Sequence, residues 1–219
     1  QQQSSESFLA TEIMISQDFI TSFVEDNNIM AQVVAAEAWD DKSQKVIFDE
    51  GIYIEETNEW PKGKPTSFGI YESFLDKLEV SSNIKTGIIS VSIEYYSPEL
   101  SKEWVILYMD YINEYMKQKK IKETTLKIKN LGLEANLTPV AQVKAALNSM
   151  IAEQIKQRAV AEASEEYVFL TINPAMLPEK KSKPSRAIIV VVSTLLAGFI
   201  ASFYFLLMLV VDPLRQEEI

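Results

Sequence analysis

The sequence predicts an α/β (α+β) membrane-proximal domain that carries a long helical extension and ends in a C-terminal transmembrane helix. Residues 87–96 (GIISVSIEYY) alternate apolar and polar side chains, which is typical of a strand with one buried face. Ser97-Pro98 then opens a helical pattern that meets no breaker before Gly132. Residues 187–211 carry no charge, and as a helix of about 37 Å they would cross a bilayer core of about 30 Å with some tilt.

The first part of the chain is expected to be helical before it turns to strands. In residues 7–27 the apolar side chains approximate one helical face, and residues 29–39 (IMAQVVAAEAW) continue in the same manner. Short strands are expected at 46–48 and 52–54. The stretch 55–65 contains two Pro and one Gly and is expected to be a surface loop.

The centre of the chain is predicted to run from helix through turn to strand. Thr66 or Ser67 can cap a helix that continues through Leu78, because a hydroxyl oxygen accepts a hydrogen bond from a backbone N–H of the first turn. Residues 81–86 are expected to form the turn that leads into the strand at 87–96.

The helical extension starts where a serine N-cap precedes a proline at the first helical position. It is expected to exceed thirty residues, about 45 to 50 Å. Thr138-Pro139 is either a new helix start or a kink, so the sequence allows a protruding antiparallel pair or one kinked rod. Residues 167–172 (YVFLTI) read as a second good strand, which is expected to pair with the first and close the sheet.

These elements predict five parts of the chain. They are an α/β base domain (1–97 and 165–173), the long helical extension (98–164), a Pro-rich connector (174–186), the transmembrane helix (187–211) and a short tail (212–219).

Composition excludes several classes of function. The net charge is -10, which disfavours nucleic-acid binding, because phosphate contacts need Lys and Arg across a surface. The chain contains no Cys, so it has no disulfide framework and no thiol nucleophile. It contains no His either, which excludes the Ser-His-Asp arrangement and most catalytic zinc sites. We therefore expect no catalytic residues, no metal and no cofactor.

Two features of the helical extension allow a binding interpretation or a structural one. Residues 117–129 (KQKKIKETTLKIK) contain six Lys and one Glu, which could attract an anionic glycan or an acidic face of another subunit, or could be a solvated helix face. Trp104, Tyr108, Tyr111 and Tyr115 recur at helical spacing, which suits stacking on sugars as well as packing between helices.

Neighbouring carboxylates suggest a glycosidase or a cation site at first sight. All of them lie in expected loops or beside the last strand and lack a second partner, so we interpret them as surface charge. They are Asp40-Asp41, Asp49-Glu50, Glu55-Glu56 and Glu165-Glu166.

The connector and the apolar segment contain the candidate functional residues. Pro174, Pro178 and Pro184 fix backbone angles, so the connector is predicted to be a stiff extended spacer that holds the domain at a set height. Arg186 ends the connector. Gly198 is expected to be the point at which a partner helix packs closely, since small residues let backbones approach.

This pattern resembles the polysaccharide co-polymerases, the Wzz-type chain-length determinants of bacterial inner membranes. Their second span follows a Pro-rich segment with a Ser-Pro-Lys-like element, and here Pro184-Ser185-Arg186 precedes Gly198 with Ser and Pro in the other order. Ser202 stands where a further Gly is often found. Three other blocks are similar to the family: 18–30 with Trp39-Asp40, 86–105 and 165–187.

The resemblance implies a non-enzymatic role. Members of the family form ring-like homo-oligomers and act with a membrane polysaccharide polymerase to set the chain length of O-antigen or a related glycan in lipopolysaccharide biosynthesis. It implies as partners further copies of the chain, the polymerase, the lipid bilayer and a lipid-linked glycan. It places the main domain in the periplasm on the bacterial inner membrane, whereas the Lys and Arg residues before the span favour the cytoplasmic side.

Two other functions remain open at this point. One is a co-polymerase for capsule or exopolysaccharide assembly or export that works with a separate tyrosine kinase. The other, of a different class, is a membrane-anchored glycan hydrolase, which would need two carboxylates facing each other across a cleft.

Overall fold

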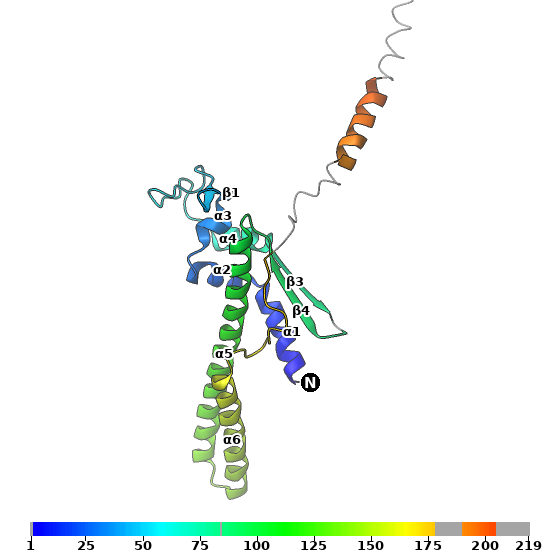
Figure 1. The fold of residues 1–219 in the computed structure, drawn as a ribbon. Coiled ribbons are helices and arrows are strands. Elements are labelled where there is room, and N and C mark those ends of the chain that lie inside the picture. Colours follow the sequence, from blue (N-terminus) through cyan, green and yellow to red (C-terminus); the bar gives the residue numbers. More distant parts are fainter. Residues whose placement is uncertain (1, 84, 178–189, 205–219) are drawn as a thin grey trace, which may run out of the picture. The chain divides into compact units, whose positions relative to one another are not determined.

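The computed structural model describes residues 2–83, 85–177 and 190–204, and the chain divides into two compact units at residues 177 and 178. The elements of the first unit follow one another as α1 (Gln2–Met14), α2 (Gln17–Asp26), α3 (Met30–Val34), β1 (Ala36–Asp40), β2 (Lys45–Phe48), α4 (Ser67–Leu75), β3 (Leu78–Asn83), β4 (Ile88–Ile93), α5 (Pro98–Leu137) and α6 (Ala141–Ala163) (Figure 1).

The hydrophobic core lies where α2 and α4 pack against the first half of α5. Its centre is aromatic: the ring of Phe23 lies 4.8 Å from that of Tyr108 and 5.3 Å from that of Phe74, measured between centroids. Trp104 extends the cluster toward the N-terminus of α5 and is 3% exposed. Such edge and tilted contacts are the favourable geometries for aromatic pairs, so α5 is anchored in the core through its N-terminal half.

Helix α5 begins as the sequence predicts. The Ser97 hydroxyl accepts a hydrogen bond from the backbone N–H of Leu100 at 3.3 Å, and Pro98 takes the first helical position. The 40 residues of α5 correspond to about 60 Å. The helix continues through Gly132, so this glycine does not end it.

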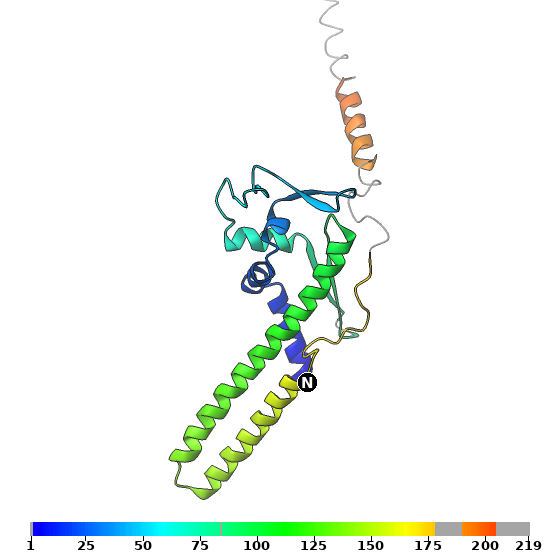
Figure 2. The ribbon, with the colours of Figure 1, turned by 60° about the vertical axis from the view of Figure 1, so that its left-hand side comes forward.

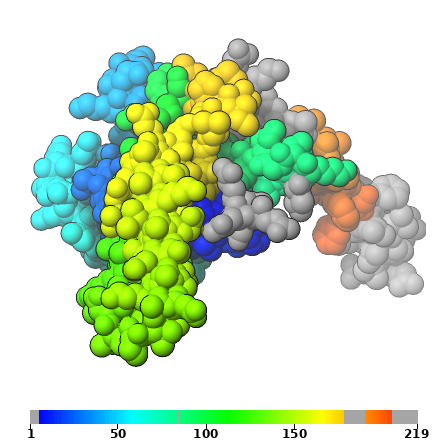
Figure 3. Space-filling view, turned by 90° about the horizontal axis from the view of Figure 1, so that it is seen from below, coloured from blue at the N-terminus to red at the C-terminus, as the bar shows by residue number. Residues whose placement is uncertain are grey.

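The turn at Thr138-Pro139 produces a hairpin, which decides between the two arrangements that the sequence allows. Thr138 caps the C-terminus of α5 and α6 then runs back along it (Figure 2). A proline disfavours helical backbone angles at the residue before it, which explains why α5 ends at this point. In Figure 3, seen from below, the hairpin projects in front of the rest of residues 1–177.

The predicted α/β sheet does not form, and helices dominate instead. The described strands make two separate antiparallel pairs, β1 with β2 and β3 with β4. The strand predicted at 87–96 is present as β4, and its side chains alternate between exposed and half-buried positions as expected. Its partner is β3, which occupies part of the turn predicted at 81–86. Residues 167–172 are not a strand, so no larger sheet is closed.

Several local expectations are also corrected. The helix predicted at 7–27 is interrupted after Met14, where the Ser16 hydroxyl bonds to the carbonyl of Ile13 at 2.7 Å. The helix predicted at 29–39 stops at Val34, because the following residues pair with β2. At 52–54 no strand forms, and Ile54 makes only an isolated bridge to Glu59.

The predicted transmembrane helix is corrected as well. Within the described residues, 190–204 are helical. No helix of the described residues combines the length and the apolar character needed to cross a membrane. This contradicts the span predicted at 187–211 and the inner-membrane localisation derived from it. The remaining residues of that segment lie outside those that the structure describes.

Candidate binding site on helix α5

The aromatic stripe predicted along α5 starts in the core and ends at the surface. Trp104 and Tyr108 are 3% and 0% exposed, because α2 and α4 cover this part of the helix. Tyr111 is half-buried and Tyr115 is 41% exposed. The stripe therefore has two roles along its length: packing at its beginning and a free aromatic surface at its end.

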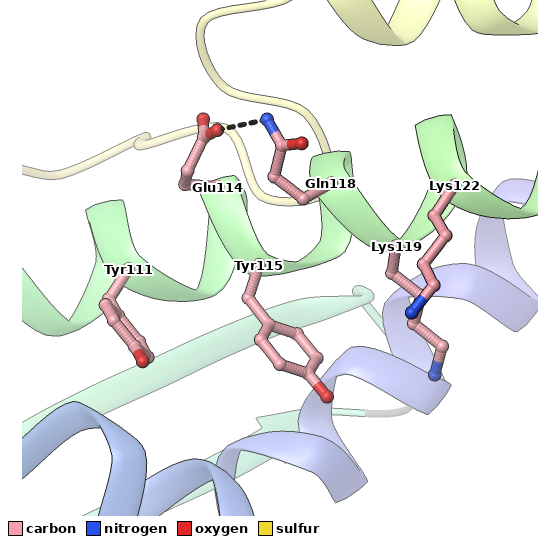
Figure 4. A pocket seen from close by; sticks show the side chains of 6 residues that line it. All are labelled: Tyr111, Glu114, Tyr115, Gln118, Lys119 and Lys122. Carbon is pink, nitrogen blue, oxygen red and sulfur yellow. Dashed lines mark hydrogen bonds between the residues drawn. The ribbon is translucent and has the colours of Figure 1, made fainter. Parts of the chain in front are cut away.

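An open groove of about 530 Å³ lies at this exposed end. We call it the α5 groove, and it is lined by Tyr111, Glu114, Tyr115, Gln118, Lys119 and Lys122 (Figure 4). Spacings of three and four residues place Tyr111, Tyr115, Lys119 and Lys122 on neighbouring positions of the helix surface. Figure 4 shows the two tyrosines and the two lysines extending toward α1 and α2, while Glu114 and Gln118 extend to the other side.

The tyrosines of the groove are held in place from α2. The Tyr111 hydroxyl donates a hydrogen bond to Oδ2 of Asp26 at 2.6 Å. Burial of the phenol, together with this carboxylate, raises the pKa of Tyr111 above its usual value. The ring of Phe19 meets Tyr111 at 5.2 Å and Tyr115 at 5.3 Å between centroids. One edge of the Tyr115 ring is thus fixed while much of the side chain stays accessible.

Part of the Lys cluster at 117–129 is committed to partners inside the protein. Lys120 forms a salt bridge with Glu6 of α1 at 2.9 Å, and its side chain is only 15% exposed. Lys127 forms an exposed salt bridge with Glu123 one turn earlier at 2.5 Å. A hydrogen bond from Lys127 also lowers the pKa of Glu123. These lysines are therefore not the cationic part of a binding surface.

Lys119 and Lys122 are the lysines of the cluster that line the groove. Both are exposed, and within the described part of the chain neither forms a salt bridge. The rim opposite them is polar: Gln118 donates a hydrogen bond to Glu114 at 2.7 Å. The α5 groove combines an accessible aromatic ring, two cations and a hydrogen-bonding rim.

The segment after α6 is attached to α5 by one buried side chain. The carboxamide oxygen of Asn113 accepts hydrogen bonds from the backbone N–H groups of Val168 and Phe169 at 3.0 and 2.9 Å. Its amide nitrogen donates to the carbonyl of Phe169 at 3.0 Å. Asn113 thus satisfies the backbone groups that a neighbouring strand would otherwise satisfy, which is why 167–172 needs no sheet.

A charged contact supports the same segment. The Tyr167 hydroxyl donates to Oε2 of Glu6 at 3.2 Å, and Glu6 holds Lys120 with its other oxygen. Burial, followed by the charge of Glu6, raises the pKa of Tyr167 to about 12. Sequence inspection missed Glu6 and Asn113, since each makes its contacts far along the chain and no local pattern marks it.

The candidate residues of the connector are not brought together in the described part of the structure. Pro174 is exposed in an irregular segment. Pro178, Pro184 and Arg186 lie outside the described residues. Gly198 lies in the helix at 190–204, where a Cβ atom would meet no atom within 4 Å. Their predicted role in spacing and packing stays a prediction.

The neighbouring carboxylates of the β1–β2 region stabilise their own turns. Asp40 accepts hydrogen bonds from the Ser43 hydroxyl at 2.6 Å and from the Lys42 backbone at 3.0 Å, which lower its pKa. Asp49 accepts one from the Gly51 backbone at 2.8 Å. The general acid of a glycosidase needs a raised pKa, so Asp40 is unsuited to that role. Across 2–83, 85–177 and 190–204, no cluster of acidic side chains is arranged to hold a metal ion.

Comparison with known proteins adds no further information: no protein-family model and no curated protein matches the chain.

Proposed function

We propose that this protein is a non-enzymatic regulator of the chain length of a surface polysaccharide, such as O-antigen, and acts as a homo-oligomeric scaffold with a polysaccharide polymerase. Several sequence blocks resemble the polysaccharide co-polymerases, among them residues 86–105. This block contains β4 and the Ser97-Pro98 start of α5, a helix of 40 residues. A chain without His or Cys also suits a scaffold better than a catalyst.

The observation that carries the proposal is the apolar surface of the α5–α6 hairpin. Between residues 126 and 160, seven large apolar side chains of these two helices are each at least 45% exposed: Leu126, Leu133, Leu137, Val143, Met150, Ile155 and Val160. Leu126, Leu133 and Leu137 recur at spacings of seven and four residues and therefore share one face of α5. Monomeric proteins rarely leave an extended apolar surface uncovered. A projecting hairpin with such a surface is suited to contacts between copies of the chain, which a scaffold requires.

Deletion of the gene tests the function directly. We expect the length distribution of the surface glycan to lose its preferred length, while the glycan is still synthesised because the polymerase is intact. Gel separation of glycan from deletion and complemented cells measures this. An unchanged length distribution would refute the proposal, and complete loss of glycan would point to a role in synthesis itself.

A further inference from the structure

The α5 groove is lined by three kinds of chemical group. Tyr115 presents an aromatic ring that is fixed from one side by Phe19. Lys119 and Lys122 add two positive charges that have no salt-bridge partner among the described residues. Glu114 and Gln118 form a rim that can accept and donate hydrogen bonds.

These groups differ from what packing or solubility alone would require. Trp104 and Tyr108 of the aromatic stripe are buried, and the neighbouring lysines Lys120 and Lys127 are paired with carboxylates. The chain as a whole carries a net charge of -10, whereas Lys119 and Lys122 place two positive charges beside an exposed tyrosine. Glu114 is the one carboxylate among the lining residues, so the groove favours an anionic ligand that also presents an apolar face.

Acidic sugars have both properties. The C–H groups on one face of a pyranose ring stack on an aromatic side chain, its hydroxyls exchange hydrogen bonds with amides and carboxylates, and its carboxylate pairs with ammonium groups. Inorganic phosphate would use the lysines but not the ring. A nucleic acid would require a more extensive basic surface than two lysines on an acidic protein.

We propose that the α5 groove binds an acidic saccharide unit, with Tyr115 against the sugar ring and Lys119 and Lys122 at the carboxylate. The inference rests on the proposed function in its choice of a saccharide, and it deepens that function by naming the glycan class. The volume of about 530 Å³ lies within the range of small-molecule pockets, about 300 to 1,000 Å³. Because the groove is open to solvent, it is better suited to one side of a polymer than to a ligand that must be enclosed.

Calorimetric titration of the full chain with oligogalacturonate tests the proposal. We expect saturable binding that weakens as salt is added, because the charged groups are exposed and therefore screened. Replacing both lysines (Lys119→Gln with Lys122→Gln) is expected to weaken binding at least about tenfold, and Tyr115→Ala about tenfold. Tyr115→Phe, which keeps the ring, is expected to retain most of the affinity.

Matched controls separate the groove from general charge and general loss of an aromatic side chain. Lys144→Gln with Lys156→Gln removes two exposed lysines from α6 and changes the net charge equally. Tyr96→Ala removes a tyrosine that is 49% exposed and also packs edge-on against one neighbouring ring. Both control variants are expected to bind as the unchanged protein does.

Four results would overturn the inference: no binding to the unchanged protein, equal losses in the control variants, equal binding of polyglutamate, or equal binding of a neutral oligosaccharide. These results leave the proposed function untouched. Conversely, if oligogalacturonate binds as expected but deletion of the gene leaves glycan length unchanged, the site stands and the proposed function falls.

Discussion

At the scale of single residues, Asn113 holds part of the segment that was predicted to be a strand. Its carboxamide makes three hydrogen bonds to the backbone of Val168 and Phe169, and the side chain is 5% exposed. A buried carboxamide that satisfies three backbone groups is costly to remove, because each group then lacks a partner. The path of the chain after α6 depends on this residue.

Asn113→Ala is expected to lower the free energy of unfolding by about 2 to 3 kcal/mol, since several buried polar groups lose their partner and only part of them can reach water. Urea unfolding of the full chain measures this. Asn148→Ala, on an exposed position of α6, is the control and is expected to change stability by less than about 0.5 kcal/mol. Equal effects of the two substitutions would contradict the role of Asn113.

The buried tyrosines predict a loss of stability at high pH. The pKa of Tyr167 is raised to about 12, against an unfolded value of about 10. Between these values the unfolded chain releases a proton that the folded protein retains, so stability falls as pH rises from about 10 toward about 12. Burial raises the pKa of Tyr108 and Tyr95 in the same direction.

Chemical unfolding at a series of alkaline pH values checks this prediction. The slope of stability against pH is expected to be smaller for Tyr167→Phe than for the unchanged protein. Identical slopes for the two proteins would exclude a contribution from Tyr167.

At the scale of elements, local signals in the sequence predict where helices start better than they predict which strands pair. The Ser97-Pro98 start of α5 and the Thr66 cap of α4 were both expected, and each depends on hydrogen bonds within one turn. The strand expected at 167–172 failed because its backbone partner is a side chain 55 and 56 residues away. Residues 36–39 were expected to be helical, yet they belong to β1 because β2 lies beside them.

The candidate site was foreseen in its composition but not in its boundaries. The Tyr stripe and the Lys cluster are visible in the sequence, because helical spacing identifies a common face. Their division into buried, paired and exposed members depends on α1 and α2, which contact α5 from positions about 100 residues earlier. Thus Lys120 is paired with Glu6 while Lys119 beside it is open to solvent.

The seam of the hairpin gives a test at the same scale. Ala161 of α6 is fully buried, whereas Ala159 is exposed on the same helix. Ala161→Leu is expected to destabilise the protein by about 1 to 3 kcal/mol, since the added atoms force the two helices apart. Ala159→Leu changes helix propensity equally and is expected to be close to neutral in urea unfolding. Similar stabilities of the two variants would show that α5 and α6 are not packed at Ala161.

At the scale of the whole molecule, the apolar hairpin surface predicts self-association. Light scattering of the purified chain is expected to give a particle mass of several copies. Leu133→Gln with Met150→Gln is expected to reduce this mass, because these side chains are 54% and 53% exposed on the hairpin. Phe68→Gln with Ile88→Gln, exposed outside the hairpin, is the control. A strict monomer would remove the scaffold mechanism.

Helix α5 runs without interruption from Trp104 in the aromatic core to Leu137 at the tip of the hairpin. An unbroken helix of about 60 Å is stiff and contains no hinge. A displacement of the tip by a bound partner is therefore transmitted as a tilt to the rings packed around Tyr108 and to the α5 groove between them. A partner bound at the tip of the hairpin is therefore expected to change the orientation of the part of α5 that carries the groove.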